Sequence, residues 1–183
     1  MHIRVATVDD AETIATVHVE SWRTTYKGIL PDDFLARLSY EQREQLWRQV
    51  LTEPGSARFV YVADAGHGQV VGFIAGGPER SGDTLYTGEL YAIYLLASYQ
   101  GQGLGRQLAS TLTTRLIQEG MTALLLWVLA ANPARKFYEQ LGGQPVYEKT
   151  VIIGGVPLLE VAYGWRDAHT ITAPSQRAKY PEL

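Results

Sequence analysis

The sequence predicts one domain of the α/β (α+β) class, in which helices pack against a mixed β-sheet. Two observations predict this class. The apolar pattern has a helical period up to about residue 51 and changes to strand-like runs from residue 59. Hairpin signals then stand on both sides of a single strand–helix–strand crossover. A doubly wound nucleotide-binding fold would need regular alternation of strands and helices, which this order excludes.

Capping residues predict the helix boundaries in the first third of the chain. Asp9 and Glu12 stand three apart, as an Asp variant of the capping box that opens the first helix. Gly28 ends its apolar pattern, Pro31 suits the first turn of a second helix, and Pro54-Gly55 stops a third. In chain order we expect a strand at 3–6, helices at 9–26, 31–38 and 40–51, strands at 59–63, 70–75 and 84–96, a helix at 104–116, a strand at 124–129, a short helix at 133–141, and strands at 146–153 and 156–163.

The strands are predicted from apolar runs and from the glycines between them. Residues 59–63 and 70–75 surround a turn at Gly66-His67-Gly68, and Gly154-Gly155 marks a second, two-residue hairpin. Residues 84–96 are apolar on both faces, which is typical of a central strand.

The crossover helix is predicted from leucines that recur along one side of residues 104–116, and Gly120 fits its C-terminal cap. Asn132-Pro133 starts the next, shorter helix. One domain is therefore expected over residues 1–166, and the tail over residues 167–183 is left unassigned.

Composition and charge narrow the possible functions. The chain has 183 residues, of which 46% are hydrophobic and 19% charged, and this excludes disorder, collagen-like sequence and a coiled coil. The net charge of −3, without a basic stripe, argues against a nucleic-acid partner. With no cysteine, the chain has no disulfide, no thiolate metal site and no cysteine nucleophile.

Nothing in the sequence predicts a membrane partner or an export signal. Residues 1–5 have no apolar signal core. The longest apolar run, residues 123–131, is far shorter than the roughly 20 residues that span a bilayer. We therefore expect a cytoplasmic protein.

The most informative segment is Tyr99-Gln100-Gly101-Gln102-Gly103-Leu104-Gly105-Arg106, between a buried strand and the leucine-lined helix. Its glycines let a ligand approach the backbone, and a helix N-terminus offers unpaired N–H groups with partial positive charge. With Arg106, these features suit a pyrophosphate. The dinucleotide-binding fingerprint needs a glycine where Arg106 stands, and the Gly-Lys-Ser/Thr of a P-loop is absent. A glycine turn that only packs helix against strand is the alternative.

At these residues the sequence resembles the GNAT superfamily of N-acetyltransferases. Their acetyl-CoA motif, Gln/Arg-x-x-Gly-x-Gly/Ala, is met by Gln100, Gly103 and Gly105, and the resemblance extends from about Ile3 to Trp165. It implies a mostly antiparallel sheet of about seven strands, with a central splayed parallel pair and about four to five flanking helices. It also implies acetyl-CoA as cosubstrate. The four histidines are scattered, so no metal is expected.

The resemblance also implies which residues hold the cofactor. The end of the central strand would pair its backbone with the pantetheine arm, and the loop amides would hold the pyrophosphate. Asn132 would contact the arm, although it equally fits a helix N-cap before Pro133. Arg135 departs from the family pattern, which has a small residue there. The implied cofactor-binding residues are Ile93, Tyr94, Leu95, Gln100, Gly101, Gln102, Gly103, Leu104, Gly105, Arg106 and Asn132.

For catalysis, the sequence favours direct attack of an amine on the thioester. There is no Gly-x-Ser-x-Gly elbow and no clustered Ser-His-Asp to form a covalent intermediate. By resemblance, the Leu95 N–H stabilises the oxyanion and Tyr138 is the general acid for the leaving sulfur. Glu89, eleven positions before Gln100, is the candidate base, acting directly or through water. The alternatives are a core aromatic for Tyr138 and a solvated charge at a strand end for Glu89.

Trp22 and Tyr26, four apart on the first helix, are the candidate substrate-binding residues. By resemblance they border the acceptor pocket, although such a pair also suits a core. Asp32 and Asp33 would favour either a cationic acceptor or the start of a helix. We expect an N-acetyltransferase for a small-molecule or peptide amine. A non-catalytic acyl-CoA-sensing module and a nucleotide-binding regulator are the alternatives, and exposed edge strands would allow a homodimer.

Overall fold

The computed structural model describes residues 1–53 and 57–172. Pro54-Gly55, the expected end of the third helix, lies outside the described residues, and so does the end of the tail. The elements are β1 (His2–Val5), the 3-10 helix η1 (Val8–Asp10), α1 (Ala11–Thr25), α2 (Asp32–Ala36), α3 (Tyr40–Thr52), β2 (Phe59–Asp64), β3 (Val70–Pro78), β4 (Gly88–Leu95), the 3-10 helix η2 (Ala97–Tyr99), α4 (Leu104–Gln118), β5 (Leu124–Leu129), α5 (Arg135–Gln140), β6 (Gln144–Ile153), β7 (Val156–Trp165) and α6 (His169–Thr172).

The strands form one seven-stranded sheet in the order β1-β2-β3-β4-β5-β7-β6. Every neighbouring pair is antiparallel except β4 and β5, which are parallel. This confirms the predicted fold class, with β4 at the centre of the sheet. The part of the chain that the structure describes has six α-helices, because the short α6 forms in the segment that was left unassigned.

The parallel pair diverges, and this divergence shapes the site. β4 and β5 pair only at Gly88 with Leu124 and at Glu89 with Leu125. Farther along β4, the Leu96 N–H still donates to the Val71 carbonyl of the β3 segment at 3.0 Å. Neighbouring residues in a strand direct their backbone groups to opposite sides. The backbone groups of Leu95 therefore face the gap that opens between β4 and β5.

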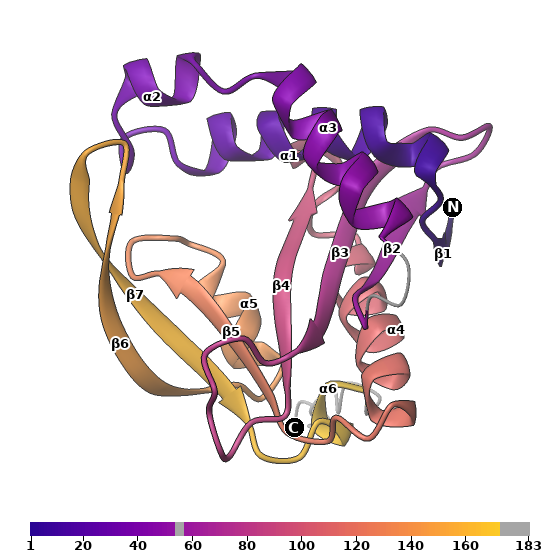
Figure 1. Cartoon of the computed structure of the whole chain (residues 1–183), viewed down its shortest axis with the longest axis vertical. Coiled ribbons are helices and arrows are strands. Elements are labelled where there is room, and N and C mark those ends of the chain that lie inside the picture. The colour runs from indigo at the N-terminus through magenta and orange to yellow at the C-terminus, as the bar shows by residue number, and fades with distance from the viewer. Residues whose placement is uncertain (54–56, 173–183) are drawn as a thin grey trace, which may run out of the picture.

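Helices cover both faces of the β2–β4 part of the sheet (Figure 1). α4 lies on one face, where leucines such as Leu108 and Leu112 are buried against the strands. α1 and α3 lie on the other face, where Ile14 and Trp47 pack against Phe73 of β3. No helix within residues 1–53 and 57–172 is long and apolar enough to cross a membrane.

The hairpin β6–β7 extends away from these layers and returns to the N-terminal helices at α2 (Figure 1). Ile153 near its tip packs with Phe34 of α2. A Cβ added to Gly154 would lie 2.9 Å from the Phe34 ring, so the hairpin tip and α2 are in close contact. The β5–β7–β6 part of the sheet and α1–α2 thus face each other across the divergence of β4 and β5.

The predicted capping box at Asp9 and Glu12 is wrong by two residues. Thr7 and Asp10 form the box, in which the Thr7 N–H donates to Asp10 Oδ2 at 2.7 Å. Asp10 is held there by two hydrogen bonds of 2.8 Å from Arg4 of β1. This tertiary contact places a 3-10 turn before α1.

The predicted start of the central strand at residue 84 is also too early. Asp83 Oδ1 accepts hydrogen bonds from the N–H groups of Leu85 and Tyr86, which forms a turn. β4 therefore begins at Gly88.

Candidate active site

A pocket of about 470 Å³ opens where β4 and β5 diverge. It is bounded by the end of β4, the glycine loop with the first turn of α4, and the segment from Asn132 through α5. The residues that line it are Thr25, Ile93, Leu95, Gln100, Gly101, Gly103, Gly105, Arg106, Asn132, Pro133, Ala134, Phe137, Tyr138 and Gln140. The structure therefore brings most of the expected cofactor residues together with Tyr138.

Three expected cofactor residues are placed elsewhere. Leu104 is buried in the core beneath α4. The Gln102 side chain turns back and donates to the Ser98 carbonyl at 2.9 Å. The Tyr94 side chain lies on the α1 face of the sheet, where it packs beside Phe73. The Tyr94 hydroxyl nevertheless reaches Tyr26, whereas the side chains of Gln102 and Leu104 do not line the pocket.

The glycines of the loop have different physical roles. Gly101 and Gly103 have φ values of +73° and +82°, a left-handed conformation that favours glycine. A Cβ built on Gly103 meets nothing within 4 Å, so the space beside this N-cap of α4 is open. A Cβ on Gly105 would lie 3.3 Å from the Phe137 ring, so Gly105 permits α4 to pack against α5. The first two glycines leave room for a ligand and the third brings two helices together.

Two side chains fix the loop at the mouth of the pocket. Gln100 Nε2 donates to the Leu95 carbonyl at 3.0 Å, which ties the loop to the end of β4. Arg106 donates to the Gln140 carbonyl at 3.0 Å, at the end of α5. The guanidinium of Arg106 and the amide groups of the α4 N-terminus therefore provide positive charge on the same side of the pocket.

Asn132 lies between the pocket and α1. Its Oδ1 accepts the Ala134 N–H at 2.8 Å, and its Nδ2 donates to the Tyr26 hydroxyl at 3.2 Å. The expected capping role is thus present at a turn, and α5 itself begins later, at Arg135. Arg135, the departure from the family pattern, donates to the Tyr163 hydroxyl at 2.9 Å and so packs this turn against β7.

Tyr138 lies on α5, is 6% exposed and reaches the pocket. Burial raises the pKa of Tyr138 above the usual value of a phenol, and the neighbouring Tyr26 hydroxyl adds to the effect. Burial also raises the pKa of Tyr26 and of Tyr94. All three phenols keep their protons at neutral pH and can act as hydrogen-bond donors.

An aromatic cluster on the α1 side of the sheet packs against Tyr94 and Tyr26. His18 of α1 is a member of this cluster that was not expected from the sequence. The Trp47 indole N–H donates to His18 Nδ1 at 3.2 Å, and the His18 ring stacks on Tyr94 with 5.0 Å between centroids. Burial, with a smaller contribution from Arg43, lowers the pKa of His18 to about 3, so its ring is neutral at pH 7. The spacing of His18, Trp22 and Tyr26 by four residues is the signal that could have predicted their common face.

Trp22 and Tyr26 form an edge-on pair with 5.0 Å between ring centroids. They pack with Leu30 and Leu35 and with Leu129 of β5. The pair is therefore part of a core cluster and also borders the gap between α1 and β5. The core alternative is thus present in the structure, and neither residue lines the pocket described above.

Glu89 is not brought into the pocket. It is 3% exposed, and its Oε2 accepts hydrogen bonds from Arg80 Nε at 3.0 Å and from the Arg80 backbone N–H at 3.3 Å. Arg80 NH2 contacts Oε1, and the guanidinium lies 4.1 Å from the centre of the Tyr91 ring. The alternative of a solvated charge is wrong, because this carboxylate is buried and ion-paired.

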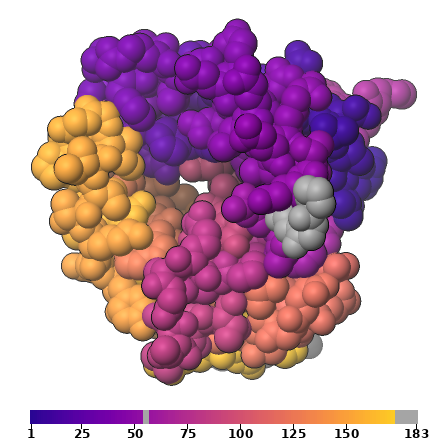
Figure 2. Space-filling view, viewed as in Figure 1, coloured from indigo at the N-terminus to yellow at the C-terminus, as the bar shows by residue number. Residues whose placement is uncertain are grey.

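The surface of the molecule has an opening near the divergence of β4 and β5. Figure 2 shows it between the N-terminal helices, the β6–β7 hairpin and the segment that leads into β4. Trp127 and Leu129 of β5 lie on the same face of the sheet, because they alternate with Leu126 and Val128 of the α4-side core. Among the described residues, no group of three or more His, Cys, Asp or Glu side chains could hold a metal ion.

Comparisons with known proteins agree with one another. The sequence model of the acetyltransferase (GNAT) family matches residues 19–143. YuaI, an uncharacterized N-acetyltransferase of Bacillus subtilis (strain 168), is 42% identical over 165 residues, which cover 90% of this chain and 92% of YuaI.

Solved structures show the same fold. The PaiA N-acetyltransferase of Thermoplasma acidophilum, in complex with coenzyme A, superposes with a TM-score of 0.63 at 20% identity, over 90% of this chain and all (100%) of that one. The ribosomal-protein-alanine N-acetyltransferase of Brucella melitensis has a TM-score of 0.69 at 23% identity, over 90% and 99% of the two chains.

Proposed function

Because the chain belongs to the GNAT family of N-acetyltransferases, we propose that it transfers the acetyl group of acetyl-CoA directly to a primary amine of a small molecule or a peptide. The observation that carries this proposal is the pocket at the divergence of β4 and β5. In it the glycine loop, the edge of β4 that β5 leaves unpaired and the Tyr138 side chain converge. Nucleotide binding alone would not require the Tyr138 hydroxyl in this pocket, whereas acyl transfer uses a proton donor there.

The pocket suits the three parts of coenzyme A. The edge of β4 at Ile93 and Leu95 offers backbone groups to the amide-containing arm. The N–H groups around Gly103 and the guanidinium of Arg106 suit the pyrophosphate. Asn132 and Tyr138 lie at the deep end, nearest to α1. The PaiA structure, which contains coenzyme A, supports this assignment.

When bound, acetyl-CoA supplies an acyl group activated as a thioester. The residues of the chain stabilise the negative charge that develops on the carbonyl oxygen and transfer protons. The Leu95 N–H, which faces the gap, donates to the carbonyl oxygen as negative charge develops on it. The amine attacks in its neutral form, a C–N bond forms and the C–S bond breaks. Tyr138 gives its proton to the departing sulfur.

The attacking nitrogen must also lose a proton. Glu89 is the candidate base of this proposal. Because Arg80 occupies its carboxylate and Glu89 does not line the pocket, the proton would reach it through water. Trp22 and Tyr26 form the wall against which the acceptor lies.

The test is thiol release from acetyl-CoA over a panel of polyamines, amino acids, aminoglycosides and peptides with free N-termini. We expect release that depends on one class of amine. Intact-mass spectrometry with acetyl-CoA alone should show no acetylated protein, because no covalent intermediate forms. Binding of acetyl-CoA without release for any amine would instead indicate a sensing module. Failure to bind it would reject both.

A further inference from the structure

A lysine ammonium group of the β6–β7 hairpin lies on an aromatic ring of β5. Lys149 Nζ of β6 lies 3.8 Å from the centre of the Trp127 ring on β5. It also lies 3.5 Å from Glu160 Oε2 on β7, its direct cross-strand partner. Between them stands Ala162, paired with Trp127, whose small side chain leaves the ring accessible from β6.

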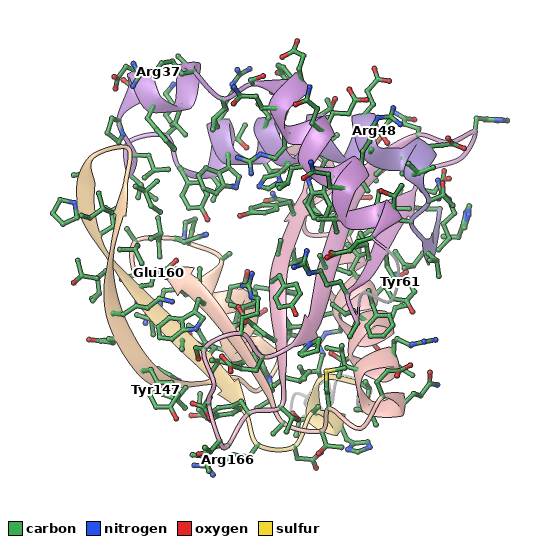
Figure 3. All side chains as sticks on the ribbon, in the orientation of Figure 1. Arg37, Arg48, Tyr61, Tyr147, Glu160 and Arg166 are labelled. Carbon is green, nitrogen blue, oxygen red and sulfur yellow. The ribbon has the colours of Figure 1, made fainter. Side chains whose placement is uncertain are left out.

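This group is close to the candidate active site. Glu160 pairs with Leu129, which packs against Tyr26. The negative charge of Glu160 contributes to raising the pKa of Tyr26, whose hydroxyl is bonded to Asn132 of the pocket. Figure 3 labels Glu160 in the part of the molecule where β5 and β7 run side by side. Glu160 is thus connected to the pocket through Tyr26, and Trp127 lies two residues before Leu129 on the same face of β5.

An aromatic face next to a carboxylate is a favourable environment for an ammonium ion. The contact that Lys149 makes is weak, because its N–O distance is 3.5 Å and its side chain is 46% exposed. Glu160 is better buried, with 19% of its side chain exposed. A second ammonium group could therefore displace the Lys149 ammonium from Trp127 and Glu160 with little loss of free energy.

We propose that Glu160 and Trp127 bind a second ammonium group of the acceptor, and that Lys149 occupies this place when no acceptor is bound. The acceptor is then a diamine or polyamine, with one amine at the thioester and another at Glu160 and Trp127. This inference rests on the proposed function, because it names the class of acceptor for the same site.

The experiment compares linear diamines of increasing length with monoamines of matched length. We expect the kcat/KM of the best diamine to exceed that of its monoamine by about tenfold, with a preference that weakens as salt screens the charge. Glu160→Gln should raise KM for the diamine about tenfold and leave kcat and the monoamine nearly unchanged. Trp127→Leu should act in the same way, whereas Trp127→Phe, which keeps an aromatic face, should retain most of the preference.

Two further variants separate this role from a general effect of charge. Lys149→Met should lower KM for the diamine several-fold, because the resident cation is gone. Glu148→Gln removes one negative charge from an exposed neighbour on β6 and should change nothing. If Glu160→Gln and Glu148→Gln shift KM equally, or if monoamines and diamines respond alike, the recognition role is refuted while the acetyltransferase activity stands.

Calorimetric titration of the diamine into the protein with bound coenzyme A gives a readout that does not depend on turnover. We expect binding by the unmodified protein that Glu160→Gln weakens about tenfold. Equal binding by both would refute the proposal. Absence of thiol release with every amine, with diamine binding intact, would refute the proposed function and leave the cation site standing.

Discussion

The Asn132 side chain donates a hydrogen bond of 3.2 Å to the Tyr26 hydroxyl, across 106 positions in the sequence. Asn132 belongs to the turn that lines the pocket at the divergence of β4 and β5, and Tyr26 directly follows α1. Both side chains are 6% exposed, so neither has ready access to bulk water as a substitute partner. This bond joins the turn that lines the pocket to the end of α1.

Breaking this bond from either side should reduce the free energy of unfolding, and the effects of the two substitutions should not be additive. Tyr26→Phe removes the acceptor and leaves a buried amide N–H unpaired, which costs about 1–3 kcal/mol. Asn132→Ala also removes the cap on the Ala134 N–H. In a double-mutant cycle from urea unfolding, we expect a coupling free energy of about 1 kcal/mol. Strictly additive effects would show that the bond does not contribute.

Acetyl-CoA should raise the melting temperature, because a ligand that binds the native state stabilises it. Gly103→Asp places a carboxylate where the structure leaves open space and should abolish this shift. The matched control is Gly68→Asp. Gly68 also has a positive φ, +77°, and open space around its Cβ, but it lies in the β2–β3 turn. An equal loss in both variants would mean that backbone strain, and not the loop, is responsible.

Much of this architecture could be predicted from periodicity and glycines, because both are local signals. The hairpins at 66–68 and at Gly154-Gly155 are confirmed, and so is the parallel pair around the crossover helix. The glycine loop could be recognised because left-handed residues before a helix restrict the sequence strongly.

What could not be predicted depends on side-chain contacts that neither periodicity nor capping patterns specify. Thr7 and Asp10 form the capping box in place of Asp9 and Glu12, and Arg4 holds Asp10 there. Glu89 is buried because Arg80 folds back over it, and nothing in the spacing of the two indicates an ion pair. His18 joins the aromatic cluster because Trp47 and Tyr94 meet it from α3 and β4.

His18 should make stability depend on acid pH. Its pKa is about 3 in the folded protein against 6.5 when exposed, so between these values the unfolded chain binds more protons. The free energy of unfolding should therefore fall as pH decreases from 6.5 toward 3, by up to about 1.4 kcal/mol per pH unit from this residue.

His18→Phe isolates this contribution, because it keeps a ring against Tyr94 but cannot titrate. At pH 7 we expect a loss of about 1–3 kcal/mol, since the Trp47 N–H loses its acceptor. At lower pH the curves of the two proteins should converge. Parallel curves in urea unfolding at a series of pH values would contradict the assignment.

Glu89→Gln tests the candidate base. It keeps the shape of the side chain but removes proton acceptance, so kcat should fall most at lower pH, where most of the amine is protonated. Affinity for acetyl-CoA should change little. Arg80→Gln is the companion variant, because it breaks the same ion pair and leaves the carboxylate in place. If both variants lose stability equally and keep an unchanged pH–rate profile, Glu89 is a structural ion-pair partner.

Tyr138→Phe is the sharpest test of the mechanism. Proton donation by a placed side chain is worth about 10²–10⁴ in rate. The leaving thiol has a reference pKa near 8.5, so its thiolate departs with modest help and we expect the lower end, about a hundredfold loss in kcat. Because burial raises the pKa of Tyr138, the phenol stays protonated across the usual assay range. The rate should then rise with pH as the amine loses its proton, without an alkaline decline below about pH 10.

Tyr163→Phe is the matched control for Tyr138→Phe. The Tyr163 ring is also buried, with 6.0 Å between its centroid and that of Tyr138, but its hydroxyl donates to Glu139 at 2.7 Å and accepts from Arg135. Its loss should lower stability and leave kcat within a few-fold. In Tyr138→Phe the ring is kept, so fold and acetyl-CoA affinity should stay nearly constant. A loss under about threefold at saturating acceptor falls far short of general-acid catalysis and would leave proton transfer to water.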